Sequence, residues 1–225
     1  VGGRAAYNAT TAVNNSFFGN GSGGLVTSGS KNTIVGTYDG NQGGLDIRTS
    51  SNNIVLSDGD GNPRLILSPD GDLFIGCTSA PSASVTGFAV QDNAGKCLVQ
   101  LATSDSGVNT VTQFFNPNGV VGTINTNGSS TNYNTSSDYR LKENVVYDWD
   151  ATTRLKQLKP ARFNFIVDAD TTVDGFLAHE AQEIVPECVS GNKDAVDADG
   201  VAVMQGIDQS KLVPLLVATI QELEA

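Results

Sequence analysis

The reactive side chains of this sequence restrict the chemistry that it can perform. Its single histidine, His179, excludes most hydrolases that use an imidazole base, unless this one residue is the base. Because no second imidazole accompanies it, we interpret His179 as a structural or surface residue. The three cysteines, Cys77, Cys97 and Cys188, are odd in number and unrelated in spacing. They predict neither a disulfide framework nor a zinc site of paired cysteines.

Two acidic segments resemble cation sites only in part. Residues 58–62 have the ligand spacing of a calcium loop at the first three positions, but Pro63 stands where that loop requires glycine and Pro69 where it requires glutamate. The acidic stretch 194–199 has no fixed ligand pattern. We interpret both segments as solvated turns, and we expect no metal and no cofactor.

The charge balance excludes one large class of function. Lys and Arg number 13 and Asp and Glu number 24, which gives a net charge of −11. A nucleic-acid binder needs a basic face, so we expect no nucleic-acid partner. No run approaches the roughly 18 apolar residues that span a bilayer, so we expect no membrane insertion. The chain begins Val-Gly-Gly rather than with Met, and we expect it to be part of a longer protein.

The composition changes abruptly near residue 136. Of the 25 glycines, 21 lie in residues 1–136, whereas the first glutamate of the chain is Glu143. Glutamate is a good helix former and glycine is a poor one, so we expect the second part to contain helices and the first part to contain few. We therefore predict a Gly/Asn-rich β region over residues 1–136 and a second domain over residues 137–225.

Short apolar bursts punctuated by turn residues predict strands and hairpins in the first region. The bursts cover residues 33–35, 53–56, 65–67, 73–75, 111–115 and 120–124. Each ends in turn chemistry such as Asp58-Gly59 or Asp70-Gly71.

These strands offer too few apolar side chains to fill the core of a single-chain sandwich. The sequence contains a weak internal repeat, here called the sequence echo. The segment 15–19 (NSFFG) returns 17 residues later as 32–36 (NTIVG). The pattern resembles the left-handed β-rolls and β-helices of trimeric adhesins and phage fibres, in which three chains share one core. The alternative is an ordinary glycine-rich β domain of one chain.

The second region is predicted to be α+β. Asp150 is expected to cap a short helix that ends before Pro160, and residues 162–167 alternate like a strand. An Asp-rich turn over 168–174 should lead into residues 176–185, which run from strand into helix. Ser210 is expected to open a final helix. Its apolar residues have the a/d spacing of a coiled coil, and they are Val213, Leu216, Ile220 and Leu223.

Four segments of the second region resemble one known family. They are 137–144 (SDYRLKEN), 158–163 (LKPARF), 175–180 (GFLAHE) and 210–216 (SKLVPLL). In this order they are similar to the motifs of the endosialidase-type intramolecular chaperones, which are C-terminal, self-cleaving trimerisation domains of phage tail fibres and tail spikes. The resemblance implies an α+β chaperone domain over residues 137–225 and a homotrimer.

The resemblance also implies a serine–lysine dyad of Ser137 and Lys142. A serine hydroxyl needs a neighbour that takes its proton, and a desolvated lysine can do so. Residues five apart on one helix face different directions. The pair would therefore meet through a bend in the backbone or between chains of a trimer, and the sequence leaves both arrangements open.

The expected reaction is one autoproteolytic cut between Ser136 and Ser137. Ser137 attacks the carbonyl carbon of Ser136, and water then hydrolyses the ester. Arg140 or backbone amides would stabilise the oxyanion, while Asp138 and Asn144 would orient the loop. The protein would thus be a serine endopeptidase that acts on itself once, within the trimer.

The resemblance places the protein in a virion, as the distal part of a tail fibre assembled in the cytoplasm of a bacterial host. The mature fibre would bind a cell-surface glycan or protein receptor of the host. The alternative is a purely structural, receptor-binding tip that retains an inert trimerisation domain. A transcription factor is disfavoured, because the acidic first region offers no basic segment that could bind DNA.

Overall fold

The computed structural model describes residues 2–92 and 94–224. The chain divides into two compact units, Val1–Tyr139 and Arg140–Ala225. Strands make up 35% of the chain and helices 15%, and a helix is the last element. The prediction of a mainly β protein that ends in a helix is therefore confirmed.

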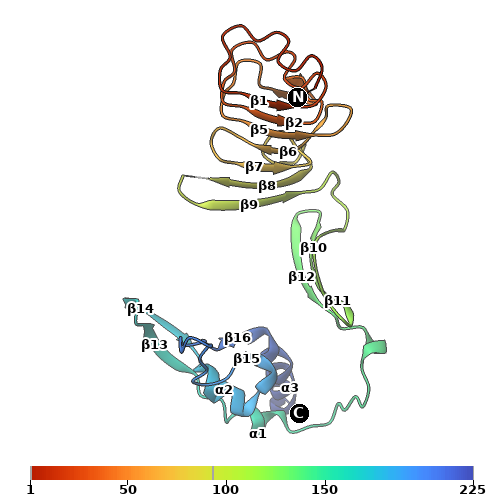
Figure 1. Ribbon diagram of the computed structural model, residues 1–225. Coiled ribbons are helices and arrows are strands. Elements are labelled where there is room, and N and C mark those ends of the chain that lie inside the picture. The colour runs from red at the N-terminus through yellow and green to blue at the C-terminus, as the bar shows by residue number, and fades with distance from the viewer. Residues whose placement is uncertain (1, 93, 225) are drawn as a thin grey trace. The chain divides into compact units, whose positions relative to one another are not determined.

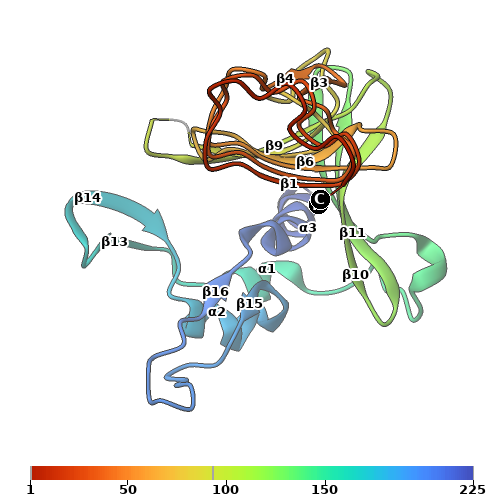
Figure 2. The ribbon, with the colours of Figure 1, turned by 45° about the horizontal axis from the view of Figure 1, so that its top comes forward.

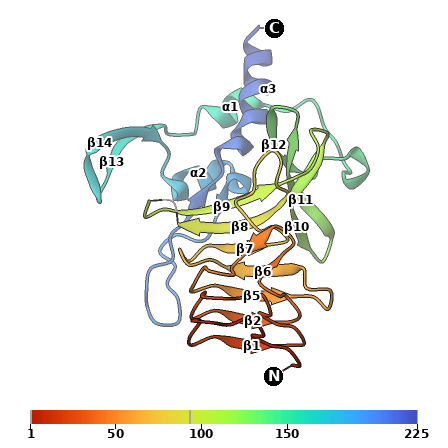
Figure 3. The same cartoon turned by 90° about the horizontal axis from the view of Figure 1, so that it is seen from above.

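A seven-stranded sheet dominates the first unit, with its strands stacked one above another (Figure 1, Figure 3). The first three strands are parallel, and the others continue as an antiparallel meander. In order across the sheet they are β1 (Ser16–Phe18), β2 (Thr33–Val35), β5 (Ile54–Ser57), β6 (Pro63–Leu67), β7 (Leu73–Ile75), β8 (Gly87–Asp92) and β9 (Cys97–Ala102). All the apolar bursts predicted as strands form strands.

The chain returns to the same edge of the sheet to add each of the three parallel strands, and equivalent positions of the sequence echo lie side by side in neighbouring strands. Ser16 pairs with Thr33, which confirms that the two copies of the echo are equivalent. Thr33 pairs in turn with Ile54, so the segment around β5 is a third copy. The third copy follows after a longer interval, and this interval contains the small hairpin of β3 (Asn41–Gln42) and β4 (Leu45–Asp46).

An asparagine ladder connects the three passes. Asn15 Oδ1 accepts a hydrogen bond from the Asn32 amide at 2.8 Å, and Asn32 Oδ1 accepts from the Asn53 amide at 2.9 Å. Asn32 Nδ2 donates to the Ser50 carbonyl at 2.8 Å. Asn32 and Asn53 are buried, and such groups are stable only with partners. The ladder therefore fixes the register of the stack.

The two faces of the seven-stranded sheet differ in burial. Every second position of each strand points to the same face. The inner face is buried in two core clusters, to which it contributes Phe17, Ile34, Val55, Ile66, Phe74 and Ala89.

The opposite face, here called the outer face, consists of two rows of residues in register across the sheet. The first row is Phe18, Val35, Leu56, Leu65, Ile75, Phe88 and Leu101. The second row is Ser16, Thr33, Ile54, Leu67, Leu73, Val90 and Val99. None of these fourteen residues, all of them in the described part of the chain, is classed as buried.

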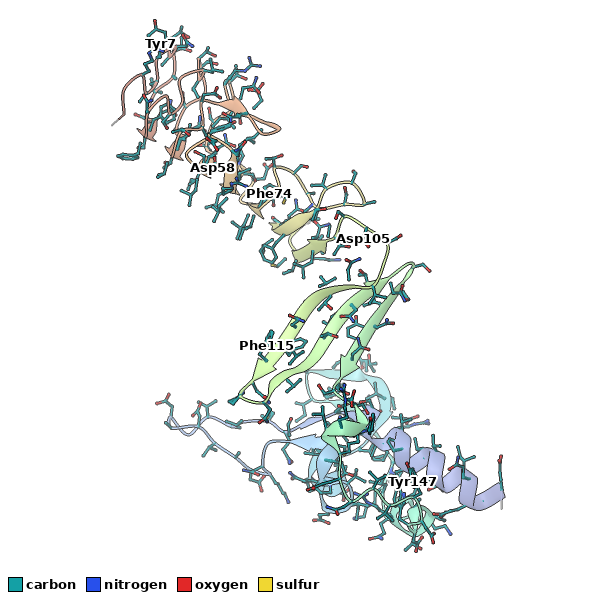
Figure 4. The ribbon with its side chains drawn as sticks, turned by 90° about the vertical axis from the view of Figure 1, so that its right-hand side faces the viewer. Tyr7, Asp58, Phe74, Asp105, Phe115 and Tyr147 are labelled. Carbon is teal, nitrogen blue, oxygen red and sulfur yellow. The ribbon has the colours of Figure 1, made fainter. Side chains whose placement is uncertain are left out.

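A three-stranded antiparallel sheet completes the first unit. Its strands are β10 (Asn109–Asn116), β11 (Gly119–Asn127) and β12 (Ser130–Thr135). Every residue from 109 to 135 is described, and none is buried. Phe115 on this sheet is exposed (Figure 4). A small sheet needs a packed apolar face to be stable, so this sheet lacks a core in a single chain.

Short helices contribute most of the buried residues in the small core of the second unit (Figure 2). The elements are η1 (Tyr139–Leu141), whose first residue belongs to the first unit, and then α1 (Ala151–Leu155), β13 (Ala161–Phe165), β14 (Asp168–Gly175), α2 (Ala178–Ile184), η2 (Pro186–Cys188), β15 (Val189–Ser190), β16 (Gly206–Ile207), η3 (Gln209–Leu212) and α3 (Val213–Glu224). The predicted Asp150 cap is confirmed, since Asp150 accepts a hydrogen bond from the Thr153 amide at 2.9 Å.

The predicted Asp-rich turn over 168–174 is wrong. These residues form β14, which pairs with β13, and the turn lies at Ile166 and Val167 instead. The β-branched run Thr171–Val173 favours a strand. An ion pair between Arg162 and Asp174, at 2.7 Å, joins the base of the hairpin.

The final helix begins differently from the prediction. Asp208 caps the turn η3 by accepting a hydrogen bond from the Ser210 amide at 3.0 Å, so Ser210 is not the cap. The helix α3 packs on its own unit through Leu212, just before it, and Leu215. The predicted a/d stripe of Val213, Leu216, Ile220 and Leu223 is exposed. This segment therefore has two apolar sides, of which one packs on its own unit and the other is exposed.

Asn32→Ala should destabilise the first unit. The substitution removes the acceptor of the buried Asn53 backbone amide, whereas the Asn53 side chain keeps Ser50 and Ser51 as acceptors. The loss should cost about 2 kcal/mol, and hydrogen exchange at the Asn53 amide should accelerate. Thermal unfolding and hydrogen exchange measure the two effects. Asn8→Ala, at an exposed position, is the control and should change little. Equal effects of the two substitutions would contradict a role of the ladder in stability.

Candidate functional site

The candidate catalytic residues lie where the two units meet in sequence. Ser137 and Asp138 follow β12 and precede the single turn η1, and Lys142 comes directly after that turn. Ser137 belongs to the first unit and Lys142 to the second. The expected dyad therefore has one member in each unit.

Ser136, on the amino-terminal side of the proposed cut, is anchored to the three-stranded sheet. Its amide donates to the Val121 carbonyl at 3.2 Å, and its hydroxyl donates to the Val120 carbonyl at 3.1 Å. Both acceptors belong to β11. The acyl side of the Ser136–Ser137 bond is thus held by a strand, which limits the directions from which a nucleophile can approach its carbonyl carbon.

The segment that carries the candidate residues is exposed throughout. Every residue from 127 to 150 is exposed, including Ser137 and Lys142. The same segment carries large side chains in contact with solvent, among them Tyr139, Leu141 and Tyr147, the last of which is 92% exposed (Figure 4). A lysine serves as a base when burial favours its neutral amine. A single chain does not provide that burial.

Asn144 has a backbone conformation that its residue type suits. Its φ is 53°, in the left-handed region that asparagine tolerates better than most residues with a side chain. The chain turns here after Lys142 and then runs without regular structure to α1. This geometry agrees with a loop-orienting role for Asn144. Asp138, Arg140 and Lys142 each make at least one non-covalent interaction.

The motif residues of the second unit build its core. Leu158, Phe176, Leu212 and Leu215 all contribute to one cluster. A Cβ atom at Gly175 would lie 3.3 Å from the Phe163 ring, so Gly175 allows a close approach of the two strands there. The segments on which the family resemblance rests thus have a structural role.

A carboxylate that the sequence analysis missed connects the two ends of the second unit. Glu222 of α3 accepts hydrogen bonds from the Ala151 amide at 2.7 Å and from the Thr152 amide at 2.9 Å, at the beginning of α1. Hydrogen bonding by Thr152 and by the Ala151 amide holds the pKa of Glu222 below its usual range. No local signal could have revealed this contact, because about seventy residues separate the partners.

The other candidate groups have structural partners. Asp58 accepts a hydrogen bond from the Asn62 amide at 2.9 Å and pairs with Arg64, and hydrogen bonding led by Asn62 lowers the pKa of Asp58 to about 2. Asp197 accepts from the amides of Asp199 and Val201, both at 2.9 Å. Both acidic segments are therefore turns, as predicted. In residues 2–92 and 94–224, no cluster of three or more His, Cys, Asp or Glu side chains could hold a metal ion.

Comparison with known protein families gives one match, which lies within the second region. The family model described as "Chaperone of endosialidase" matches residues 137–190. The predicted resemblance is therefore confirmed for these residues. No curated protein matches the chain. Among the described helices, none is both long and apolar enough to cross a bilayer.

Glu222→Gln should lower the thermal stability of the second unit by a few degrees. The neutral amide is a weaker acceptor at the beginning of α1 than the carboxylate. Since the pKa of Glu222 is lowered by folding, its contribution is complete above the unfolded pKa of about 4.3 and is lost as the pH falls through the folded pKa. The difference between wild type and variant should thus shrink in acid.

Calorimetry between neutral and acidic pH tests this expectation. Glu224→Gln removes the same charge from the same helix and should leave the melting temperature nearly unchanged. A stability difference between wild type and Glu222→Gln that persists below the folded pKa would contradict the proposed role of the carboxylate.

Proposed function

We propose that residues 137–225 form an assembly domain that joins three copies of the chain and then releases itself by cutting between Ser136 and Ser137. The observation that carries this proposal is the family match, which begins at Ser137. The proposed nucleophile would therefore be the first residue of the domain that departs.

The exposed stripe of α3 supports assembly through this domain. Val213, Leu216, Ile220 and Leu223 follow the three-four-three spacing of coiled-coil core positions, and all four are exposed. The other side of the segment packs on its own unit through Leu212 and Leu215. A stripe of this kind is stabilised when helices of other copies pack against it. A homotrimer would bury it.

The anchored Ser136 supports the proposed chemistry. The Ser137 hydroxyl oxygen attacks the Ser136 carbonyl carbon, while the neutral Lys142 amine takes the hydroxyl proton. The C–N bond between the two serines breaks, and Lys142 gives the proton to the departing Ser137 nitrogen. Water then hydrolyses the ester, which leaves a carboxylate on Ser136 and restores the Ser137 hydroxyl. Arg140 or backbone amides would stabilise the oxyanion.

Exposure of the site gives a physical reason for delaying the cut until assembly. Ser137 and Lys142 are exposed in one chain. Packing of three copies would bury the segment, favour the neutral lysine and exclude water from the oxyanion. The domain would first raise the effective concentration of the three chains. It would cut only after it had assembled its own active site.

The first unit would be the distal part of a phage tail fibre or tail spike. The stacked passes of β1, β2 and β5 suit a β-roll or β-helix shared by three chains. Such a fibre would reside in the virion after assembly in the bacterial cytoplasm, and it would bind a host glycan or protein receptor.

A second function is a structural tip that retains an inert chaperone domain. The exposure of both dyad residues in one chain favours this alternative, because an exposed lysine is a poor base. Cleavage of the purified protein distinguishes the two functions.

Wild-type protein should give two fragments on denaturing electrophoresis, with masses that correspond to residues 1–136 and 137–225. Ser137→Ala and Lys142→Ala should abolish the cut, because they remove the nucleophile and the base. Lys156→Ala, at an exposed lysine of the second unit, is the matched control and should cut normally. An intact wild-type band from the assembled protein would favour the structural tip.

Ile220→Glu should prevent both assembly and cutting. The substitution places a charge in the middle of the exposed stripe, and a charge is not tolerated in a coiled-coil core without a partner. Native mass spectrometry measures assembly, and electrophoresis measures cutting. Gln221→Glu adds the same charge at an exposed position on the same helix and should affect neither. An assembled Ile220→Glu variant would contradict the proposed role of the stripe.

A further inference from the structure

The outer face of the seven-stranded sheet is apolar over its whole height. Twelve of the fourteen residues in its two rows are apolar, and the exceptions are Ser16 and Thr33. Several of the largest are well exposed, including Phe18 at 52%, Ile75 at 44% and Val99 at 57%. An exposed aliphatic side chain is ordinary when it occurs singly. Two continuous rows of apolar side chains across seven strands are unusual on a surface that faces solvent.

The face carries no charge, although the molecule is strongly acidic. The net charge of the chain is −11, and none of the fourteen positions is charged. Of the charged residues of these strands, Arg64 lies outside the two rows, and Asp92 lies beside the second row at the end of β8. Copies of an acidic chain repel one another across charged surfaces. This face is a place where copies can approach without that repulsion.

Most of the apolar residues in the two rows are substantially exposed. Seven of the twelve are at least 40% exposed, and they are Phe18, Val35, Ile54, Leu56, Ile75, Val99 and Leu101. A patch larger than a few hundred Å² on a soluble protein usually marks an interaction site. A glycan site would require converging polar groups, and the rows offer only two hydroxyls.

The shape of the face indicates which surface covers it. Each strand contributes only two residues to the two rows, whereas seven strands stack along them, so the face is a narrow strip (Figure 1). Rotation about an axis parallel to the strip brings identical strands of other copies to the same height. Homo-oligomers use closed rotational symmetry of this kind.

We infer that the outer face packs against the outer faces of other copies of this chain, strand against equivalent strand, around a common axis. The inference rests on the proposed assembly of several copies, but it requires neither the stripe of α3 nor the cut. It identifies the outer face as the surface through which the first unit would bury further apolar side chains. The fibre region would then hold its copies together by itself after the chaperone domain has left.

Photo-cross-linking of the full-length chain tests the inference. Phe18 of the outer face is replaced by p-benzoylphenylalanine, which bonds to neighbouring C–H groups on illumination. The same substitution at Tyr7 is the control, because Tyr7 is an exposed aromatic residue outside the sheet. Native mass spectrometry of the unilluminated proteins records the number of copies.

The expected result is an assembled protein in which position 18 cross-links two chains and position 7 does not. Mapping of the cross-linked peptides should identify β1 or β2 of the second chain. An assembled protein in which position 18 reaches only its own chain, or a segment of another chain outside the sheet, would overturn the inference and leave the proposed assembly intact. A protein that is a single chain by native mass would overturn both.

Discussion

Burial of apolar side chains is the interaction on which this molecule depends, and a single chain provides too little of it. The strands of the stack contribute one buried row, while the outer face, the three-stranded sheet and the stripe of α3 remain in solvent. Water disfavours such surfaces in proportion to their area. One chain therefore leaves apolar side chains exposed at three places. We propose that contact between copies buries all three.

Polar interactions give one chain its form before any such contact is made. The ladder of Asn15, Asn32 and Asn53 sets the register of the three parallel passes, and each buried amide has a partner. Asp58 fixes the turn between β5 and β6, and Glu222 joins the beginning of α1 to the end of α3. These bonds are specific in direction, so they determine shape, whereas apolar burial is not directional and mainly provides stability. A chain organised in this way can present a preformed apolar strip to its copies.

The sequence predicted the elements with strong local signals and missed those set by distant partners. Apolar bursts between turn residues identified β2, β5, β6, β7, β10 and β11, whereas β8, β9 and β12 lack so clear a burst. The echo of two segments was visible, but the third copy was hidden by the longer interval before β5. Residues 168–174 were predicted as a turn from their acidic composition, although β-branched residues and the pairing with β13 make them a strand. The Glu222 contact depends on a partner far away in sequence, and the proposed burial of Ser137 and Lys142 depends on other copies of the chain. Local sequence patterns encode neither.

The central claim is that the cut at Ser137 follows from assembly. Size-exclusion chromatography coupled to mass spectrometry, under native and then denaturing conditions, tests it by measuring the number of copies and the integrity of the chains in the same fraction. We predict a fraction of three copies whose chains are divided between Ser136 and Ser137, and a single-chain fraction whose chains are whole. Divided chains in the single-chain fraction would contradict the claim, as would an assembled fraction in which every chain stays whole.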